Sequence, residues 1–321
     1  MMRYRTLGDT DLVVSVIGFG GWAIGGDWGE VDDTRSDEAL RTAVDLGITF
    51  FDTADVYGFG HSERLCGRVL SSVRDRVVIA TKGGLRWNES GRVWRDCSPK
   101  YITGAVEASL RRLQTDVIDL YQIHAPDPKI PQAETMECLS NLVDEGKIRY
   151  VGVSNYSVPQ MRDAAGKRRV DTLQTSYHLL YREAECELLP YCRSQNIGVI
   201  SYGALAHGLL TGLIDSQRVF PKSDWRASSK EFVSEGLKRN VSVAQSVGKL
   251  AHELGKSTSE LAIAWTIANP DVNTVIVGAR NSAQVKMNAG ADFLVPEEYM
   301  AILNSLVSDK QWADVPFPRP T

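Results

Sequence analysis

Short runs of apolar residues alternate along this chain with segments of helical periodicity, and this alternation limits the possible folds more than any other feature. The apolar runs predict strands at 16–20, 48–51, 77–80, 117–123, 147–153, 172–176, 197–202 and 275–277. Helical segments follow them, at 34–46, 63–70, 99–113, 133–143, 259–268 and from 282. One further helix is expected to begin at about 157, and another to include residues 187 and 188. Strands that are apolar along their whole length are buried on both faces, which is typical of a parallel sheet covered by helices.

Eight such units predict a (β/α)8 TIM barrel that spans residues 1–321 as one domain. No linker rich in proline, glycine or serine interrupts the alternation, which favours one domain over two. The chain is longer than the roughly 250 residues of a typical barrel. The surplus lies at 203–256 and after 292, so we expect extra helices before the seventh helix and at the C-terminus. The first 14 residues, with a turn at 8–11, are expected to form a β-hairpin that covers the barrel bottom.

Local signals mark the ends of two helices. Thr34 to Asp37 matches a capping box, and Gly47 is placed to end the helix that follows it. Ser98 and Pro99 offer an N-cap and a first-turn proline for the helix that runs to Leu113.

Composition excludes several classes of function. With 36 Lys and Arg against 40 Asp and Glu, the net charge of −4 lacks the basic excess of a nucleic-acid-binding protein. No run of about 18 apolar residues predicts a membrane span, and the start of the chain lacks an apolar signal core. The five cysteines show no CxxC spacing, which favours buried thiols over a disulfide framework or a metal site. We expect a cytoplasmic protein without a nucleic-acid or membrane partner.

The segment 18–23, Gly-Phe-Gly-Gly-Trp-Ala, formally matches a dinucleotide-binding fingerprint. A true fingerprint opens a helix at once, because the pyrophosphate binds at the N-terminus of that helix. Here the residues that follow, Ile-Gly-Gly-Asp-Trp-Gly, do not favour a helix. The sequence therefore does not predict a Rossmann fold, and any nicotinamide cofactor binds through another architecture.

Four reactive side chains lie where predicted strands end, and the carboxyl ends of barrel strands meet at one rim. Asp52 ends the second strand and Tyr57 follows in the next loop, while Lys82 and His124 end the third and fourth strands. Each alone is commonly a cap, a turn aromatic, a surface charge or a loop histidine. Together they bring a carboxylate, a phenol, an ammonium and an imidazole to one place.

This combination suits the protonation of an oxyanion as hydride reaches the adjacent carbon. A phenol titrates near ~10 in water, so it needs help to give up a proton at neutral pH. A lysine ammonium beside Tyr57 would favour the phenolate and lower its pKa, and Asp52 would keep that lysine charged. His124 is then placed to orient or polarise a carbonyl oxygen.

Around these residues the sequence resembles the bacterial-type aldo-keto reductase family. The similar segments begin at Arg5-Thr6-Leu7-Gly8 and extend to about Ala291; they include 51–58 (FDTADVYG), 80–82 (ATK), 120–124 (LYQIH), 146–155 (GKIRYVGVSN) and 208–212 (GLLTG). The resemblance implies NADPH-dependent reduction of an aldehyde, ketone or keto-sugar to the alcohol. Hydride would come from nicotinamide C4, and the catalytic tetrad would fall on Asp52, Tyr57, Lys82 and His124, with Tyr57 as the proton donor.

The resemblance also implies a cofactor site. It assigns the nicotinamide carboxamide to Ser154, Asn155 and Gln174, and the nicotinamide ring to Tyr202. It assigns the pyrophosphate to Leu205 and Gly208, and the adenosine to Gly278, Arg280, Gln284 and Asn288. Gln174 also fits a strand-end cap, and Asn288 also fits a residue that closes its own helix. The Arg280 guanidinium suits bidentate binding of a 2′-phosphate, which favours NADPH, with NADH still possible.

The sequence departs from the family pattern at three positions. Met287 stands where many members have a glutamate that contacts adenine, which puts the adenine contacts in doubt. His207 replaces a common arginine and His178 replaces a common asparagine. We assign neither histidine a catalytic role.

The loops expected at the barrel top are rich in aromatic residues: Trp22, Trp28, Phe59, Trp87, Trp94 and Trp225. Trp22 is expected to form a wall of the substrate pocket together with Tyr57 and His124. The identity of the carbonyl substrate stays open. So does the oligomeric state, because the tail Asp309–Thr321 could cover either the barrel or a neighbouring molecule.

Two other functions stay open on the sequence alone. The same residues would serve an NAD(P)+-dependent dehydrogenase that oxidises a sugar or an alcohol. Alternatively, the protein would bind NADP(H) with little turnover, as the regulatory β-subunits of potassium channels in this superfamily do. The intact tetrad argues against that last function.

Overall fold

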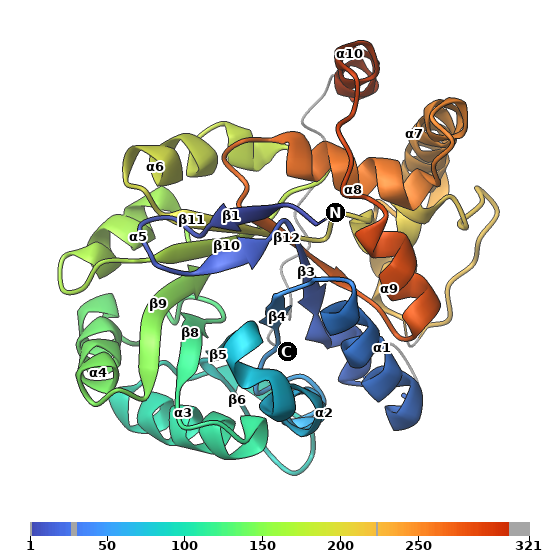
Figure 1. Ribbon diagram of the computed structural model, residues 1–321. Helices are drawn as coiled ribbons and strands as arrows, with labels where there is room; N and C mark the ends of the chain where they lie inside the picture. Colours follow the sequence, from blue (N-terminus) through green and yellow to red (C-terminus); the bar gives the residue numbers. More distant parts are fainter. Residues whose placement is uncertain (1, 27–30, 223, 308–321) are drawn as a thin grey trace.

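The computed structural model describes residues 2–26, 31–222 and 224–307, and in it eight parallel strands close into a barrel inside a ring of helices (Figure 1). The strand order follows the chain: β3 (Ile17–Gly20), β4 (Phe50–Asp52), β5 (Val78–Gly83), β8 (Ile118–Ile123), β9 (Ile148–Ser154), β10 (Thr172–Ser176), β11 (Gly198–Tyr202) and β12 (Thr274–Gly278), which pairs with β3. The predicted (β/α)8 barrel is therefore confirmed.

A helix follows each barrel strand and covers its outer side. These helices are α1 (Asp33–Asp45), α2 (His61–Leu70), α3 (Pro99–Leu113), α4 (Gln132–Asp144), α5 (Val158–Ala165), α6 (Leu188–Ser194), α8 (Thr258–Ala268) and α9 (Ser282–Ala289). Two further helices, α7 (Ser234–Glu253) and α10 (Glu297–Ser305), occupy the two regions of surplus length. Both additions to the barrel are thus confirmed.

Helix ends follow the local chemistry of the sequence, with one correction. Ser98 is the N-cap of α3, with Pro99 in its first turn, as predicted. Gly47, with φ of +82°, follows α1 as predicted. The capping box predicted at Thr34 is wrong, because the Asp32 side chain accepts a hydrogen bond from the backbone N–H of Arg35 and starts α1 earlier.

Hairpins cover both ends of the barrel. The predicted one pairs β1 (Tyr4–Thr6) with β2 (Val13–Ser15) and buries Leu7, Leu12 and Val14 against the start of the barrel interior. The sequence did not predict the second, β6 (Leu85–Trp87) with β7 (Val93–Arg95), which follows β5 at the opposite end. Its strands are too short to show a clear period.

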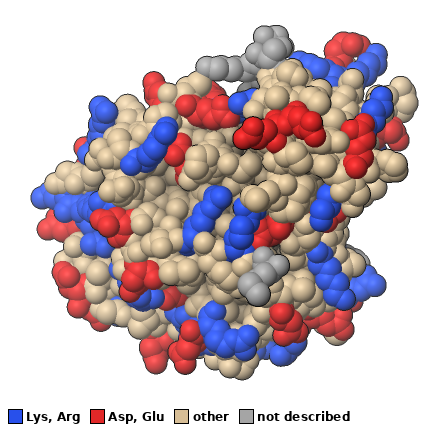
Figure 2. All heavy atoms as spheres, turned by 45° about the horizontal axis from the view of Figure 1, so that its top comes forward, with Lys and Arg blue, Asp and Glu red and all other residues tan. Residues whose placement is uncertain are grey.

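The surface carries both signs of charge. On the face drawn in Figure 2, acidic and basic side chains are interspersed. None of the helices in the described ranges combines the length and the apolar character needed to cross a bilayer. All five cysteines are free thiols, and four of them are buried.

The turn of the first hairpin fits tightly against the barrel. Gly8 has φ of +61°, and a Cβ atom there would collide with the backbone nitrogen of Gly198, where β11 begins. Gly146 also has a positive φ, of +73°, but a Cβ atom there would meet nothing within 4 Å. The two glycines therefore share a backbone constraint and differ in packing.

We expect Gly8→Ala to lower the free energy of unfolding by about 3 kcal/mol, because strain and a backbone collision add. Gly146→Ala is the matched control and should cost about 1 kcal/mol, from the left-handed backbone alone. Denaturant unfolding of both variants measures the difference. Equal losses would show that the hairpin turn tolerates displacement.

Candidate active site

The four side chains predicted to act together do meet at the carboxyl ends of the strands. Asp52 ends β4, Lys82 lies in β5, His124 follows β8, and Tyr57 lies in the turn after β4; all four are buried. The Lys82 ammonium lies 2.5 Å from Asp52 Oδ1 and also donates to the Tyr57 hydroxyl oxygen at 3.4 Å. A lysine thus connects the carboxylate to the phenol.

Burial dominates the electrostatics of the cluster. It lowers the pKa of Lys82, and the Asp52 carboxylate opposes that shift by stabilising the ammonium. Burial also lowers the pKa of His124 well below its usual value, and the charge of Lys82 adds to the effect. The His124 imidazole is therefore neutral at pH 7, and its ring meets Tyr57 edge-on with centroids 5.6 Å apart.

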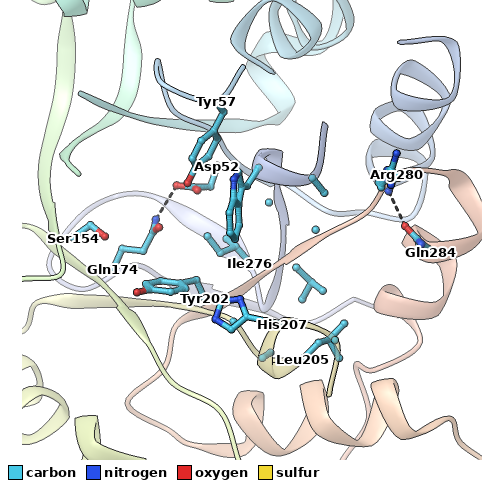
Figure 3. Close-up of a pocket in the computed structure, with 18 of the residues that line it drawn as sticks. Asp52, Tyr57, Ser154, Gln174, Tyr202, Leu205, His207, Ile276, Arg280 and Gln284 are labelled. Carbon is cyan, nitrogen blue, oxygen red and sulfur yellow. Dashed lines mark hydrogen bonds between the residues drawn. The ribbon is translucent and has the colours of Figure 1, made fainter. Parts of the chain in front are cut away.

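A cavity of about 470 Å³ opens above these residues. Trp22, Tyr57 and His124 line it, and the Trp22 and Tyr57 ring centroids are 6.4 Å apart. The structure brings nine of the ten predicted cofactor residues to its wall: Ser154, Asn155, Gln174, Tyr202, Leu205, Gly208, Gly278, Arg280 and Gln284. In Figure 3, Ser154 and Gln174 lie near Asp52, and Arg280 and Gln284 lie across the pocket from them.

Asn288, the tenth predicted cofactor residue, does not line the cavity. It is buried, and its side-chain nitrogen donates to the carbonyl oxygen of Gly278 at 3.3 Å. This contact joins α9 to the end of β12. Its Oδ1 accepts no hydrogen bond from the described residues.

Hydrogen bonds tie three strand ends to the cluster. The Asn155 side chain, on a backbone with φ of +61°, donates to the carbonyl oxygen of His124 at 3.1 Å. Its Oδ1 accepts a hydrogen bond from the Tyr202 hydroxyl at 2.8 Å. Gln174 donates to Asp52 Oδ2 at 2.8 Å, so it is part of the cluster rather than a strand-end cap.

Among the cavity residues that were not predicted as part of the site, His207 and Arg226 carry titratable side chains. His207 lies in the 3-10 helix η4 (Ala206–Thr211), and Arg226 lies in η5 (Trp225–Ser228) within the long insertion. The Arg226 guanidinium donates to the His207 carbonyl oxygen at 3.1 Å and pairs with Asp224 at 2.6 Å. The fold of the insertion brings Arg226 to His207, and no periodic pattern in the sequence could reveal this contact.

Of the aromatic residues expected at the barrel top, Trp22 alone lines this cavity among those that the structure describes. Phe59 packs on Trp87, Trp94 lies beside Arg86, and Trp225 packs on His207. These rings stabilise rim loops. Trp28 and the tail Asp309–Thr321 lie outside the described residues.

Comparisons with known proteins agree with this geometry. The model of the Aldo/keto reductase family matches residues 16–308. The chain belongs to the aldo/keto reductase family. It is 41% identical to aldo-keto reductase YhdN of Bacillus subtilis, over 89% of this chain and 87% of that protein. It is 34% identical to the NADH-specific methylglyoxal reductase of Escherichia coli, over 90% of this chain and 93% of that one.

A solved structure shares the whole architecture. The glycerol dehydrogenase AKR11B4 from Gluconobacter oxydans is 36% identical, with a TM-score of 0.90 over 98% of both chains. The predicted resemblance is therefore confirmed. As an aldo/keto reductase, this protein is an enzyme of carbonyl oxidoreduction, in a family that uses nicotinamide cofactors.

Three histidines of the interior and the cavity wall should stay neutral well below pH 7. Burial lowers the pKa of His178 to about 3, and burial beside Arg226 lowers that of His207 to about 4; His124 shifts in the same direction. Because a lowered pKa extends the neutral form to lower pH, we expect three of the five histidines to remain neutral at about pH 5.5, where a histidine of usual pKa near ~6.5 is mostly charged.

Side-chain NMR of the histidine rings during a pH titration measures this directly. The urea-unfolded protein is the control, because all five rings should then titrate together. Titration of His124 near its usual pKa in the folded protein would contradict the neutral imidazole.

Proposed function

We propose that this aldo/keto reductase uses NADPH to reduce the carbonyl group of an aldehyde, ketone or keto-sugar to the alcohol. The observation that carries the proposal is the position of Lys82, whose buried ammonium contacts both Asp52 and Tyr57 where they reach the cavity. The partner of the protein is then a small carbonyl compound. Trp22 supplies an apolar wall beside Tyr57.

The cavity suits an extended dinucleotide. At one end, Ser154, Asn155 and Gln174 offer polar atoms for a carboxamide, next to the aromatic ring of Tyr202. In the middle, three successive residues with positive φ, from Ala206 to Gly208, curve the backbone around the cavity. Such a turn suits the close approach of a pyrophosphate.

At the other end of the cavity, Arg280 lies exposed just before α9. Its backbone N–H donates to Gln284 Oε1 at 2.8 Å, which fixes this turn. A fork of N–H donors matches a phosphate group. This end therefore suits the 2′-phosphate of NADPH.

Each residue of the cluster then has a separate task. A bound reduced nicotinamide would supply hydride to the carbonyl carbon. The Tyr57 hydroxyl gives its proton to the developing alkoxide, and the Lys82 ammonium at 3.4 Å stabilises the phenolate that remains. Asp52 holds Lys82 in its charged form. The neutral imidazole of His124 offers a ring N–H to the same carbonyl oxygen.

The oxidative direction is a second candidate, because the chain is similar to a glycerol dehydrogenase over almost its whole length. The Tyr57 phenolate, stabilised by Lys82, would then take the proton of an alcohol. Assays of both directions with the same alcohol and carbonyl pair separate the two candidates.

Tyr57→Phe tests the proton donor. We expect kcat to fall at least ~100-fold while NADPH binding is kept, because general-acid catalysis contributes that much and the ring still fills its place. Tyr156→Phe is a matched control, since it removes a hydroxyl that donates to Gln132 at 2.7 Å outside the cavity. A Tyr57→Phe enzyme with nearly normal kcat would overturn the role of Tyr57.

Arg280→Ala tests the choice of cofactor. Losing a charged hydrogen bond to phosphate costs about 1.5–3 kcal/mol, so we expect the KM for NADPH to rise at least ~10-fold. The KM for NADH should change little, because NADH carries no 2′-phosphate. Steady-state assays with each cofactor measure this, and equal changes for both would show that Arg280 does not select NADPH.

A further inference from the structure

Gln122 is a buried amide next to the catalytic cluster, and nothing in the mechanism above uses it. It lies in β8, two residues before His124, and has no exposed surface. Its Nε2 donates to Asp52 Oδ2 at 3.0 Å. Its Oε1 accepts from Gln174 Nε2 at 3.2 Å. Gln122 therefore contacts both a member of the cluster and a predicted nicotinamide ligand.

The Asp52 carboxylate sets the orientation of both amides. Its Oδ1 faces the Lys82 ammonium, and its Oδ2 receives the amide nitrogens of Gln122 and Gln174. A carboxylate oxygen accepts hydrogen bonds only, so neither glutamine can turn its carbonyl oxygen toward Asp52. Once Gln122 is oriented in this way, its own Oε1 is the acceptor that remains for the second N–H of Gln174.

The amide of Gln174 is consequently held in one orientation. Both hydrogens of its Nε2 have acceptors, one on Asp52 and one on Gln122. Its carbonyl oxygen is left for another donor, and Gln174 lines the cavity. The amide of a nicotinamide carboxamide is a donor of that kind.

The neighbouring strand leaves room for this arrangement. Gly152 in β9 is the register partner of Gln122. A Cβ atom at Gly152 would come within 2.9 Å of Gln122 Cγ and would also collide with the Thr172 side chain. The missing side chain therefore allows Gln122 to lie across β9 toward β10.

We propose that Gln122 is a positioning residue of the reaction, which orients Gln174 toward the nicotinamide and holds Asp52 toward Lys82. The Gln122 amide thus links the position of the bound nicotinamide to Asp52. Asp52 in turn keeps Lys82 charged beside the proton donor. This inference rests on the proposed function and adds to it a residue that does not itself line the cavity.

Gln122→Leu tests the proposal, because leucine keeps much of the volume and removes both polar atoms. We expect the Kd for NADPH to rise up to about 10-fold, as for a lost hydrogen bond between two neutral amides, and kcat to fall as well. The Kd for 2′-phospho-ADP-ribose, which lacks the nicotinamide, should stay within about 2-fold. A merely structural defect would weaken both ligands alike, and that outcome would overturn the proposal.

A second variant gives a signature in pH. In Gln122→Glu the neutral carboxylic acid still donates to Asp52, but its ionised form repels that carboxylate. We expect kcat of this variant to fall with rising pH through an ionisation that wild type and Gln122→Leu do not show. Identical pH profiles in all three proteins would contradict the role of Gln122.

Two controls separate this inference from the proposed function. Gln132→Leu makes the same exchange in α4, where Gln132 accepts from the Tyr156 hydroxyl, and should leave both dissociation constants unchanged. If wild type binds 2′-phospho-ADP-ribose as tightly as NADPH, the nicotinamide end of the proposed function is wrong. If wild type prefers NADPH and Gln122→Leu keeps the full preference, only the role of Gln122 is wrong.

Discussion

The structure of the site depends on one buried charge, the ammonium of Lys82. A lysine with no exposed surface loses its hydration, at an effective cost of several kcal/mol in a protein interior. Asp52 at 2.5 Å, the carbonyl oxygen of Thr53 at 2.9 Å and the Tyr57 hydroxyl at 3.4 Å replace the lost water. These three oxygen atoms position the ammonium, and the ammonium in turn positions them. Removing Asp52 would leave an uncompensated charge in the barrel.

The need to hold Lys82 and its partners in place involves several strands. The carboxylate that neutralises Lys82 must itself be held, and Gln122 from β8 and Gln174 from β10 hold it. The turn after β4 is fixed to the barrel as well, since the backbone N–H of Asp55 donates to the carbonyl oxygen of Lys82 at 3.1 Å. Tyr57 is thus positioned by the sheet, although it belongs to a loop. A reacting group needs such support, because small displacements reduce catalysis strongly.

The barrel and the cluster could be predicted because both follow from the apolar pattern: β5 begins with an apolar run, β8 is mostly apolar, and Lys82 and His124 come where these segments end. Hydrogen bonds between distant segments have no such pattern. Gln122 is one polar residue inside a buried strand, and its partners lie 70 and 52 residues away. Arg226 reaches the cavity only through the folding of the insertion after β11. The β6–β7 hairpin and the cap at Asp32 depend on short local contacts that apolar spacing does not reveal.

The two ends of the cavity are built differently, and under the proposed function this separates the chemistry from the choice of cofactor. Around Asp52, buried side chains satisfy one another, so a change at one strand end disturbs the others. Arg280 and Gln284 are exposed, and the contact between them joins a backbone N–H to a side chain within a single turn. Substitution there costs little stability. If Arg280 binds the adenosine phosphate as proposed, the affinity for that phosphate can change without rebuilding the buried cluster, because Arg280 and Gln284 lie across the cavity from Asp52 (Figure 3).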